Sequence, residues 1–290
     1  MDDNSRYKRN VRIATMIIVV ASIVGASLIA IVSLPGIGLL SPYQEYHTDL
    51  TISPPASSYS ISISANDSNI QIYQGGNNSI YVDVTVSGWV RLSNENVYIS
   101  REVVGDSVNL VVNTPRFFAA FTANAKLYLP SGATAGYLTA ETSNGNENVY
   151  GALNAVNMTL STTNGNIGTS GLSSGRVYAS TVNGNIDVTA VNLSSCNENT
   201  VNGNLHLTIS EILKSGTYSL NSVNGNQDLY INKLSNATLA LSTVNGNIAV
   251  INLVVETTVS SSHTLEGTMN GGGASVSMKT SNGNLRITGT

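Results

Sequence analysis

The sequence predicts an all-β protein, most of it a parallel β-solenoid of about 20-residue coils, with an N-terminal β cap and one preceding transmembrane α-helix. Three observations predict this architecture. Asn-Gly-Asn occurs seven times between residues 144 and 284, apolar and polar residues alternate around each copy, and a long uncharged run lies near the N-terminus. A repeat of this length indicates that one small supersecondary unit has been stacked many times.

The N-terminus predicts a membrane anchor. Residues 1–12 carry four basic residues and precede an uncharged run over residues 13–34, which as a helix would be about 33 Å long and match a bilayer core. The run is longer than a signal-peptide core and no clear cleavage site follows it, so we expect a retained helix. Positive charge marks the cytoplasmic side. We therefore expect a protein of the cell membrane with a cytoplasmic tail (1–12), a single transmembrane span (13–34) and an extracellular remainder.

The next two segments predict a linker and a cap. Residues 35–56 hold four of the six prolines, which is typical of a juxtamembrane linker. Residues 57–130 alternate without the motif, as in Tyr59–Ser64 (YSISIS), and predict β-strands that cover the first coil, because a solenoid end needs a covered edge. Phe117–Phe121 (FFAAF) is an apolar run that fits either a buried cap or a docking patch for a partner.

Residues 131–290 contain the repeat, and each copy predicts strand, turn, strand. Around Asn164, for example, Met158 and Leu160 lie on the apolar parity before the turn and Ile167 resumes it afterwards. The same parity places a hydroxyl residue on the inward side two residues before each motif, where it can bond the turn backbone or the equivalent hydroxyl of the next coil. These residues are Thr142, Thr162, Thr181, Thr200, Ser222, Thr243 and Thr280.

The motif itself predicts structural turns. Glycine would supply a positive φ at the corner, asparagine tolerates the left-handed region, and identical asparagines stacked at the strand spacing can bond amide to amide. The turn residues are Asn144, Gly145, Asn164, Gly165, Asn183, Gly184, Asn202, Gly203, Asn224, Gly225, Asn245, Gly246, Asn282 and Gly283. Successive glycines are 20, 19, 19, 22, 21 and 37 residues apart, so the last gap is close to two periods.

Two architectures compete for this pattern. Asn-Gly between alternating strands is a strong hairpin signal and would give an antiparallel meander. A meander places unlike residues opposite each other, whereas a parallel solenoid places equivalent positions directly above one another. The solenoid is favoured because only this arrangement explains why each site keeps its chemistry through seven copies.

The repeat also carries a family resemblance. The Thr/Ser-x-Asn-Gly-x-Ile/Leu units, after a strand such as Lys126–Pro130 (KLYLP), resemble the proposed adhesin family of domains of unknown function in bacterial and archaeal surface proteins. The resemblance covers about residues 57–290 and implies a β-rich surface domain. An acidic residue often follows the glycine in that family, but here Asn stands there in all seven copies, which puts acid-dependent ion binding in doubt.

The sequence offers no assembled chemistry, so we expect no catalytic residue, no cofactor and no metal. The three histidines, His47, His206 and His263, are scattered, and no acidic residue recurs at a fixed repeat position as calcium-binding repeats require. Cys196 is the only cysteine, and its inward register predicts a buried, inert thiol. Glu198 contradicts the apolar parity; either a β-bulge flips the register there or the chain buries a functional carboxylate.

The net charge and the N-glycosylation patterns limit which partners and modifications we expect. The net charge is −4 with no basic cluster beyond the membrane run, so we expect no nucleic-acid partner. Sparse surface charge also suits an acidic exterior. Five asparagines carry the N-glycosylation pattern on the expected outer side, namely Asn66, Asn77, Asn157, Asn192 and Asn236.

These observations predict a non-enzymatic cell-surface protein, an adhesin-like or structural β-solenoid platform anchored by one membrane span. Its regularly spaced Ser, Thr and Asn side chains would face surface glycans or envelope proteins. Two alternatives stay open: the ectodomain of an envelope sensor or regulator that acts through a membrane partner, and the subunit of a surface filament whose solenoid ends or Phe117 segment make head-to-tail contacts.

Overall fold

The computed structural model describes residues 43–53, 58–89, 91–115, 121–131, 133–153, 155–173 and 175–290. Within these ranges all regular structure is β-strand, twenty-one strands in total. No helix in the described ranges has the length and hydropathy to cross a membrane. The predicted tail, the transmembrane run (13–34), half of the linker (35–42 and 54–56) and nearly all of the Phe117 segment lie outside the described residues. The other half of the predicted linker contains a strand, Gln44–Ile52.

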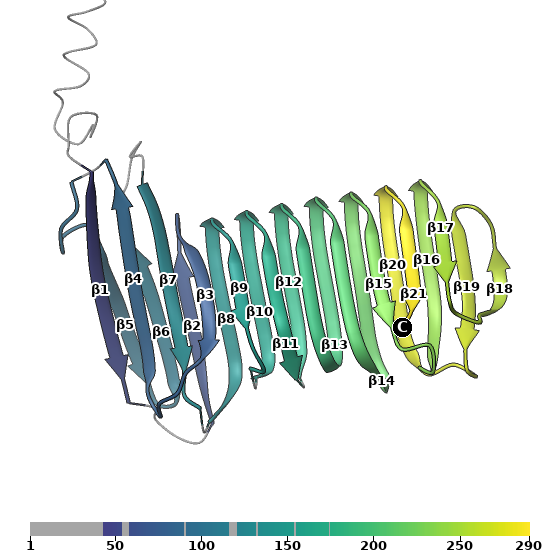
Figure 1. Cartoon of the computed structure of the whole chain (residues 1–290), viewed down its shortest axis with the longest axis horizontal. Helices are drawn as coiled ribbons and strands as arrows, with labels where there is room; N and C mark the ends of the chain where they lie inside the picture. Colours follow the sequence, from purple (N-terminus) through teal and green to yellow (C-terminus); the bar gives the residue numbers. More distant parts are fainter. Residues whose placement is uncertain are drawn as a thin grey trace, which may run out of the picture.

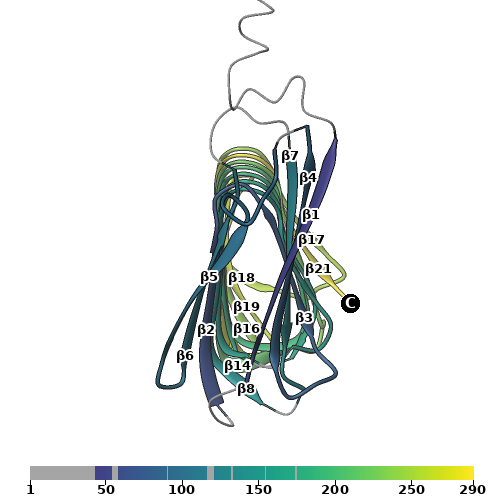
Figure 2. The same ribbon diagram turned by 90° about the vertical axis from the view of Figure 1, so that its left-hand side faces the viewer.

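The strands form two facing layers, which are visible end-on in Figure 2. Seven strands precede the repeat: β1 (Gln44–Ile52), β2 (Ser58–Ala65), β3 (Asn69–Gln74), β4 (Ile80–Gly88), β5 (Tyr98–Val104), β6 (Ser107–Asn113) and β7 (Phe121–Leu129). β2 and β3 make the first coil. On the first layer β6 pairs parallel with β2 and antiparallel with β5; on the second, β7 pairs parallel with β3, and β4 and β1 follow antiparallel.

The repeat supplies the rest of both layers. Its strands are β8 (Thr134–Asn144), β9 (Glu147–Tyr150), β10 (Ala155–Asn164), β11 (Ile167–Ser173), β12 (Arg176–Asn183), β13 (Ile186–Asn202), β14 (Leu205–Asn224), β15 (Gln227–Ile231), β16 (Ala237–Asn245), β17 (Ile248–Ile251), β20 (Ala274–Asn282) and β21 (Leu285–Gly289). Each Asn-Gly-Asn turn joins a first-layer strand to a second-layer strand, and β13 and β14 contribute to both layers.

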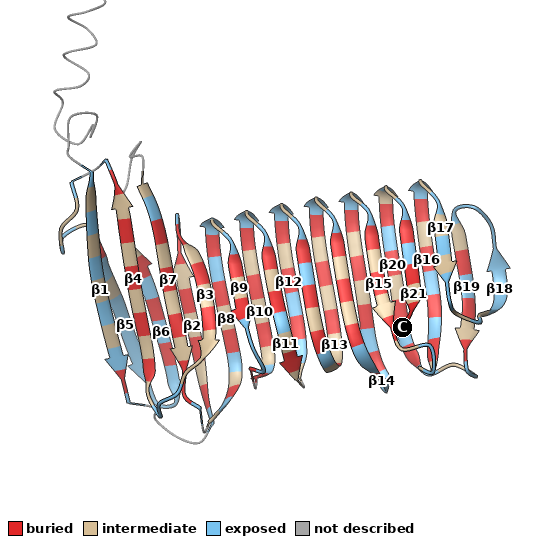
Figure 3. Ribbon diagram, viewed as in Figure 1, coloured by how far each residue is buried: buried red, intermediate tan, exposed pale blue. Residues whose placement is uncertain are grey.

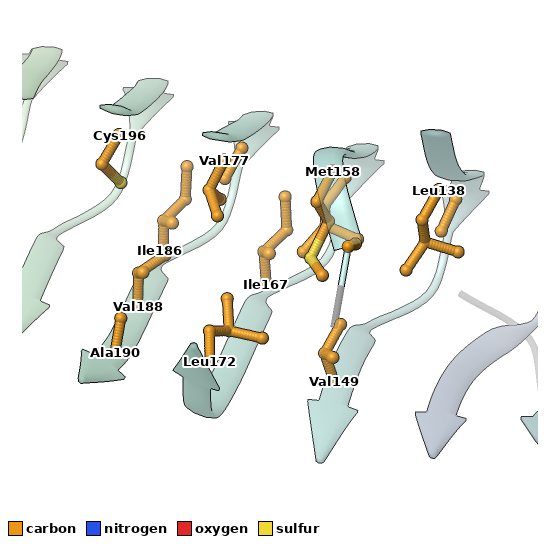
Figure 4. Close-up of a cluster of buried hydrophobic side chains, with 14 of the residues drawn as sticks. Leu138, Val149, Met158, Ile167, Leu172, Val177, Ile186, Val188, Ala190 and Cys196 are labelled. Atoms are coloured by element: carbon orange, nitrogen blue, oxygen red, sulfur yellow. The ribbon is translucent and has the colours of Figure 1, made fainter. Parts of the chain in front are cut away.

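Successive coils pair in parallel, with equivalent positions aligned. Leu138 lies beside Met158, Met158 beside Val177, and Val177 beside Cys196, while Asn144, Asn164 and the later first asparagines also align. This pairing excludes the antiparallel meander for the repeat. Inward residues from both layers fill one continuous core, seen as buried bands in Figure 3 and as stacked side chains in Figure 4. Each coil therefore buries its apolar side chains against the coils above and below it.

The order of the coils in space departs from their order in sequence. β20 and β21, which carry the last motif, lie between the coil of β14 and β15 and the coil of β16 and β17 (Figure 1). After β15 the chain passes over one coil position and forms β16 and β17 in the position beyond it. An antiparallel hairpin follows, β18 (Glu256–Ser260) and β19 (Thr264–Met269), and β19 pairs with β16. The chain then returns to fill the open position. The 37-residue gap therefore contains this hairpin and the return, not a degenerate coil.

The first coil carries a turn whose sequence differs from the repeated motif. Asp67, Ser68 and Asn69 occupy the places that Asn, Gly and Asn hold in the next coil, because Asn144 bonds Asp67 and the Asn146 backbone bonds Asn69. Residues 57–130 thus contain the first coil as well as its cap.

Candidate functional site

The turns line up in one column along the stack (Figure 1). The backbone ladder continues through them: Gly145 N–H donates to the carbonyl of Asn164 at 3.1 Å, and Glu147 N–H donates to that of Asn166 at 2.9 Å. Equivalent bonds follow from coil to coil up to Asn245 and Asn247. This column holds the most regular polar array in the described chain, so we consider it the candidate functional surface.

The first asparagines form an amide ladder. Each Nδ2 donates to the Oδ1 of the coil before it at 2.7 to 2.9 Å, for example from Asn183 to Asn164. The ladder begins at Asp67, whose carboxylate accepts from Asn144 at 2.7 Å. All the amides point the same way, so their positive ends face this carboxylate. At the final rung, Asn245 Oδ1 accepts no hydrogen bond from the residues that the structure describes.

The second asparagines form a different ladder. Each Oδ1 accepts the backbone N–H of the second asparagine in the next coil at 2.8 to 2.9 Å, as Asn166 Oδ1 does from Asn185. Their side chains are exposed. The Oδ1 is used by the stack, but the Nδ2 makes no hydrogen bond within the described residues. A row of outward amide donors therefore runs along the column.

The inward hydroxyls are structural. Thr181 Oγ1 donates to the carbonyl of Gly165 at 3.1 Å and Thr200 Oγ1 to that of Gly184 at 3.1 Å, and the other coils repeat this bond or a close variant. All seven of these threonines and serines are buried. They satisfy the turn carbonyls from inside and cannot present a hydroxyl to a ligand.

The motif glycines are required for a reason other than the expected one. Of the seven, only Gly283 has a positive φ, and its value of 158° is close to extended backbone; no motif asparagine has a positive φ either. A Cβ on Gly184 would instead lie 1.8 Å from the carbonyl oxygen of Gly165, and the other motif glycines show values up to 2.2 Å. Glycine is needed because the coil before it approaches too closely for any side chain.

Exposed valines flank the donor row on the side before four of the seven motifs. Val182, Val201, Val223 and Val244 are 42%, 41%, 44% and 67% exposed. In four of the seven motif coils the turn column therefore presents an apolar side chain beside an amide donor, whereas Ser143, Thr163 and Ser281 hold the same position in the other three. This combination fits a polymer whose surface alternates hydroxyl and carbon–hydrogen groups.

Three buried carboxyl or amide side chains, Glu147, Glu198 and Gln227, interrupt the apolar interior. Glu147 and Gln227 occupy the position directly after the motif, where Ile167 and Leu285 stand in other coils, and all are essentially unexposed. Both carboxylate oxygens of Glu147 lack a partner at hydrogen-bonding geometry. Burial raises the pKa of Glu147 to about 9; the backbones of Ser161 and Thr142 oppose this shift only partly. Glu147 is therefore a neutral acid at physiological pH.

Glu198 is buried without any flip of register. Its strand runs in continuous register from Ser195 to Asn202 beside both neighbours, and the irregularity lies earlier, between Leu193 and Ser195. The bulge interpretation for Glu198 is wrong, because the chain buries the carboxyl itself. Burial raises the pKa of Glu198 well above its usual range, and the buried thiol of Cys196 lies 3.7 Å from Glu198 Oε1.

The other predicted residues lie apart from one another. His47, on β1, is 3.1 Å from Glu45, His206 packs beside Tyr230 on the outer second layer, and His263 lies in the β18–β19 turn. No group of three or more His, Cys, Asp or Glu side chains with metal-binding geometry occurs within the described ranges. Arg286 pairs with Asp228 at 2.6 Å on the surface.

The structure separates the five sequons into two kinds. Asn157 Nδ2 donates to the carbonyl of Gly136, and Asn236 Nδ2 donates to that of Asn270, so the atom that would carry a glycan is occupied. Asn192 is half-buried on β13. Asn66 and Asn77 lie exposed in turns. Glycosylation, where it occurs, is therefore expected at Asn66 and Asn77 first.

A protein-family model, described as Toastrack DUF4097, matches residues 102–288. The chain belongs to the Toastrack DUF4097 family. The expected resemblance to an adhesin-associated domain family of unknown function is thus confirmed. Membership also agrees with the all-β, solenoid-like fold.

Several solved structures match this Toastrack chain at low identity. They include a proposed cell adhesion protein of Clostridium sporogenes (11% identity, 85% of this chain and 100% of that one, TM-score 0.38). Others are a proposed adhesin of Bacteroides fragilis (10%, 84% and 97%, 0.42) and a proposed lipid-binding protein of Parabacteroides distasonis (13%, 84% and 96%, 0.40). No curated protein matches the chain.

Proposed function

We propose that this Toastrack chain is a non-enzymatic surface protein, in which residues 13–34 anchor the N-terminus in the cell membrane and the β-solenoid stands outside as a rigid, adhesin-like platform. The observation that carries the proposal is the use of the motif. The first asparagines, the Oδ1 atoms of the second asparagines, the inward hydroxyls and the turn backbone all form hydrogen bonds within the stack, and only the Nδ2 groups of the second asparagines are left facing outward. A motif used in this way builds a stiff rod, and the function lies in what the rod displays.

The display surface in this proposal is the turn column, with surface glycans or envelope polymers as its partners. The support is the row of free Nδ2 donors, repeated at the strand spacing of about 4.8 Å, with an exposed valine beside four of them. Polyhydroxylated chains offer acceptors and apolar patches at similar intervals. The array is weak at each coil and gains strength by repetition along the column.

Topology is tested by single-cysteine labelling in intact cells. The natural Cys196 is buried, so the full chain should resist a membrane-impermeant maleimide. Lys214→Cys, at an exposed position in the solenoid, should label from outside, whereas Ser5→Cys should label only after permeabilisation. Labelling of Ser5→Cys in intact cells, or protection of Lys214→Cys, would contradict the proposed orientation.

The display surface is tested by a matched pair of substitutions on a glycan array. Asn185→Asp keeps the Oδ1 that accepts the Asn204 backbone but removes the outward donor, so binding should fall while stability holds. Asn183→Asp removes a donor that the ladder itself uses, so stability should fall instead. Equal glycan binding by the wild type and Asn185→Asp would count against the turn column as the display surface.

A further inference from the structure

The two layers end in four edge strands, and one of them differs from the others. β5 and β1 close the proximal end, where the chain enters from residue 43, and β18 and β17 close the distal end (Figure 1). β1 carries exposed Glu45, His47 and Asp49, and β5 carries exposed Arg101 and Glu102. Charges of this kind protect an edge from pairing with another strand.

β17 has no such protection. Its sequence is Ile-Ala-Val-Ile, with no charged residue, whereas β18, its counterpart on the first layer, begins with Glu256. β17 pairs with β21 on one side, and no described strand pairs with its other side. The hairpin that covers β16 stays on the first layer. The distal end is therefore capped on one layer and open on the other.

Backbone donors at this end are also open. Gly283 N–H and Leu285 N–H donate to the carbonyls of Asn245 and Asn247 in the last coil, as in every earlier coil. Gly246 and Ile248 are the equivalent residues of that last coil, and no coil of the described chain lies beyond them to accept from their N–H groups. The strand therefore offers a template for one more β-strand.

Apolar surface gathers at the same place. Ile248 and Val250 are only half-buried, although the equivalent Leu285 and Ile287 of the neighbouring strand are fully buried. Ile251 is 40% exposed, and Val254, just beyond β17, is 85% exposed. An added strand would complete the backbone ladder and cover the end of the core.

We propose that β17 pairs antiparallel with β17 of a second copy of this chain. An uncharged strand meets its own copy without like-charge repulsion, whereas two copies of β1 would bring Glu45 and Asp49 together. Such an isologous contact has a twofold axis perpendicular to the strands. It places the two stacks end to end with their proximal ends pointing in opposite directions.

An end-to-end pair of this kind can join two opposing membranes, and this part of the inference rests on the proposed function. The described chain begins beside β1 at the proximal end, and under the proposed function an anchor before it places β17 at the end of the stack away from its own membrane. Two copies in one membrane point the same way and cannot make the contact, whereas copies on opposing membranes can. A four-residue edge gives a weak single contact, and many copies on each surface would add their affinities.

The test uses charge at Ile251, on the outer side of β17. The wild-type full chain in detergent micelles should form end-to-end pairs. In an antiparallel pair of β17 strands the two Ile251 side chains lie on the same face near the twofold axis, so a charge at this position meets its own copy. Ile251→Glu and Ile251→Lys should each weaken pairing about tenfold or more, and their mixture should restore it. Sedimentation velocity and negative-stain images measure the pairing. Thr189→Glu, in the same row at mid-stack, is the matched control and should pair like wild type.

Rescue by the mixture separates pairing from misfolding, because a misfolded variant gains nothing from a partner of opposite charge. Wild type that stays single at all concentrations, pairs joined side by side, or a mixture that fails to pair would each overturn the inference. The micelle experiment does not depend on membrane orientation. Pairing together with a failed cysteine-labelling result would therefore leave this inference standing and remove only the proposed function, and the reverse result would remove only the inference.

Discussion

The first coil and the later coils build the same turn from different residues. The first coil has Asp67, Ser68 and Asn69 where the later coils have Asn, Gly and Asn. A Cβ on any motif glycine would collide with a carbonyl oxygen of the coil before it; on Gly145, for example, it would lie 2.2 Å from the carbonyl oxygen of Ser68. Ser68 follows no earlier turn in the column, so a side chain is tolerated there. Asp67 likewise has only to accept a bond. The residue at each turn is thus determined by the coil that precedes it.

The largest effect should come from adding a methyl group where a coil precedes the turn. In Gly184→Ala the new Cβ would lie 1.8 Å from the Gly165 carbonyl oxygen, so two coils must separate and several hydrogen bonds must break. We expect a loss of about 4 kcal/mol or more in the free energy of unfolding, measured by urea denaturation.

Ser68→Ala is the matched control, since it keeps a Cβ at the equivalent turn and removes only a 3.1 Å bond to the Asn69 carbonyl. Its expected cost is about 1 kcal/mol or less. Similar losses in Gly184→Ala and Ser68→Ala would contradict the role assigned to the preceding coil.

The next effect compares the buried position after the turn in two neighbouring coils. Glu147 and Ile167 occupy equivalent buried positions in neighbouring coils. Glu147 ionises near pH 4.5 when unfolded but only near pH 9 when folded, so between these values the unfolded chain binds fewer protons. Stability should therefore be full below pH 4.5, fall as the pH rises, and level off above pH 9. From pH 4.5 to pH 7 the loss is about 3 kcal/mol, at roughly 1.4 kcal/mol per pH unit.

Glu147→Ile should remove much of this slope and raise stability at pH 7, because it restores the side chain used in the next coil. Glu198 should keep a part of the slope, since burial also raises its pKa. Glu102→Gln, at an exposed site on β5, should leave the profile unchanged. Urea midpoints from pH 4 to pH 10 provide the measurement, and a wild-type maximum near neutral pH would refute both this account and the suggested fit to an acidic exterior.

The sequence predicts whatever each coil repeats and misses whatever depends on the order of coils. The turns, the inward parity and the parallel stacking follow from equivalent residues at fixed spacing. The placement of β20 and β21 does not, because Asn224, Asn245 and Asn282 offer identical bonds and no motif specifies its neighbour. The turn at Asp67 was missed for the opposite reason: it shares the geometry of the motif but only one of its residues. The sequence shows that residues 248–251 carry no charge, but only the order of the strands in space shows that β17 is the edge strand of the second layer.

The smallest effect compares a position in the middle of the first-asparagine ladder with the position at its end. Asn183 Nδ2 donates to Asn164 and its Oδ1 accepts from Asn202, so Asn183→Ala removes two rungs in mid-ladder. Asp67→Ala removes one rung at the end of the ladder. These groups are exposed and water replaces part of each bond, so we expect losses of about 1 kcal/mol for Asn183→Ala and about half of that for Asp67→Ala.

Added salt should narrow the difference in stability between wild type and Asp67→Ala, because only the Asp67 rung carries a full charge. It should leave the stability loss of Asn183→Ala unchanged. Thermal melts of both variants at low and high salt measure this, and an Asp67→Ala loss equal to that of Asn183→Ala at every salt concentration would show that the ladder does not act bond by bond.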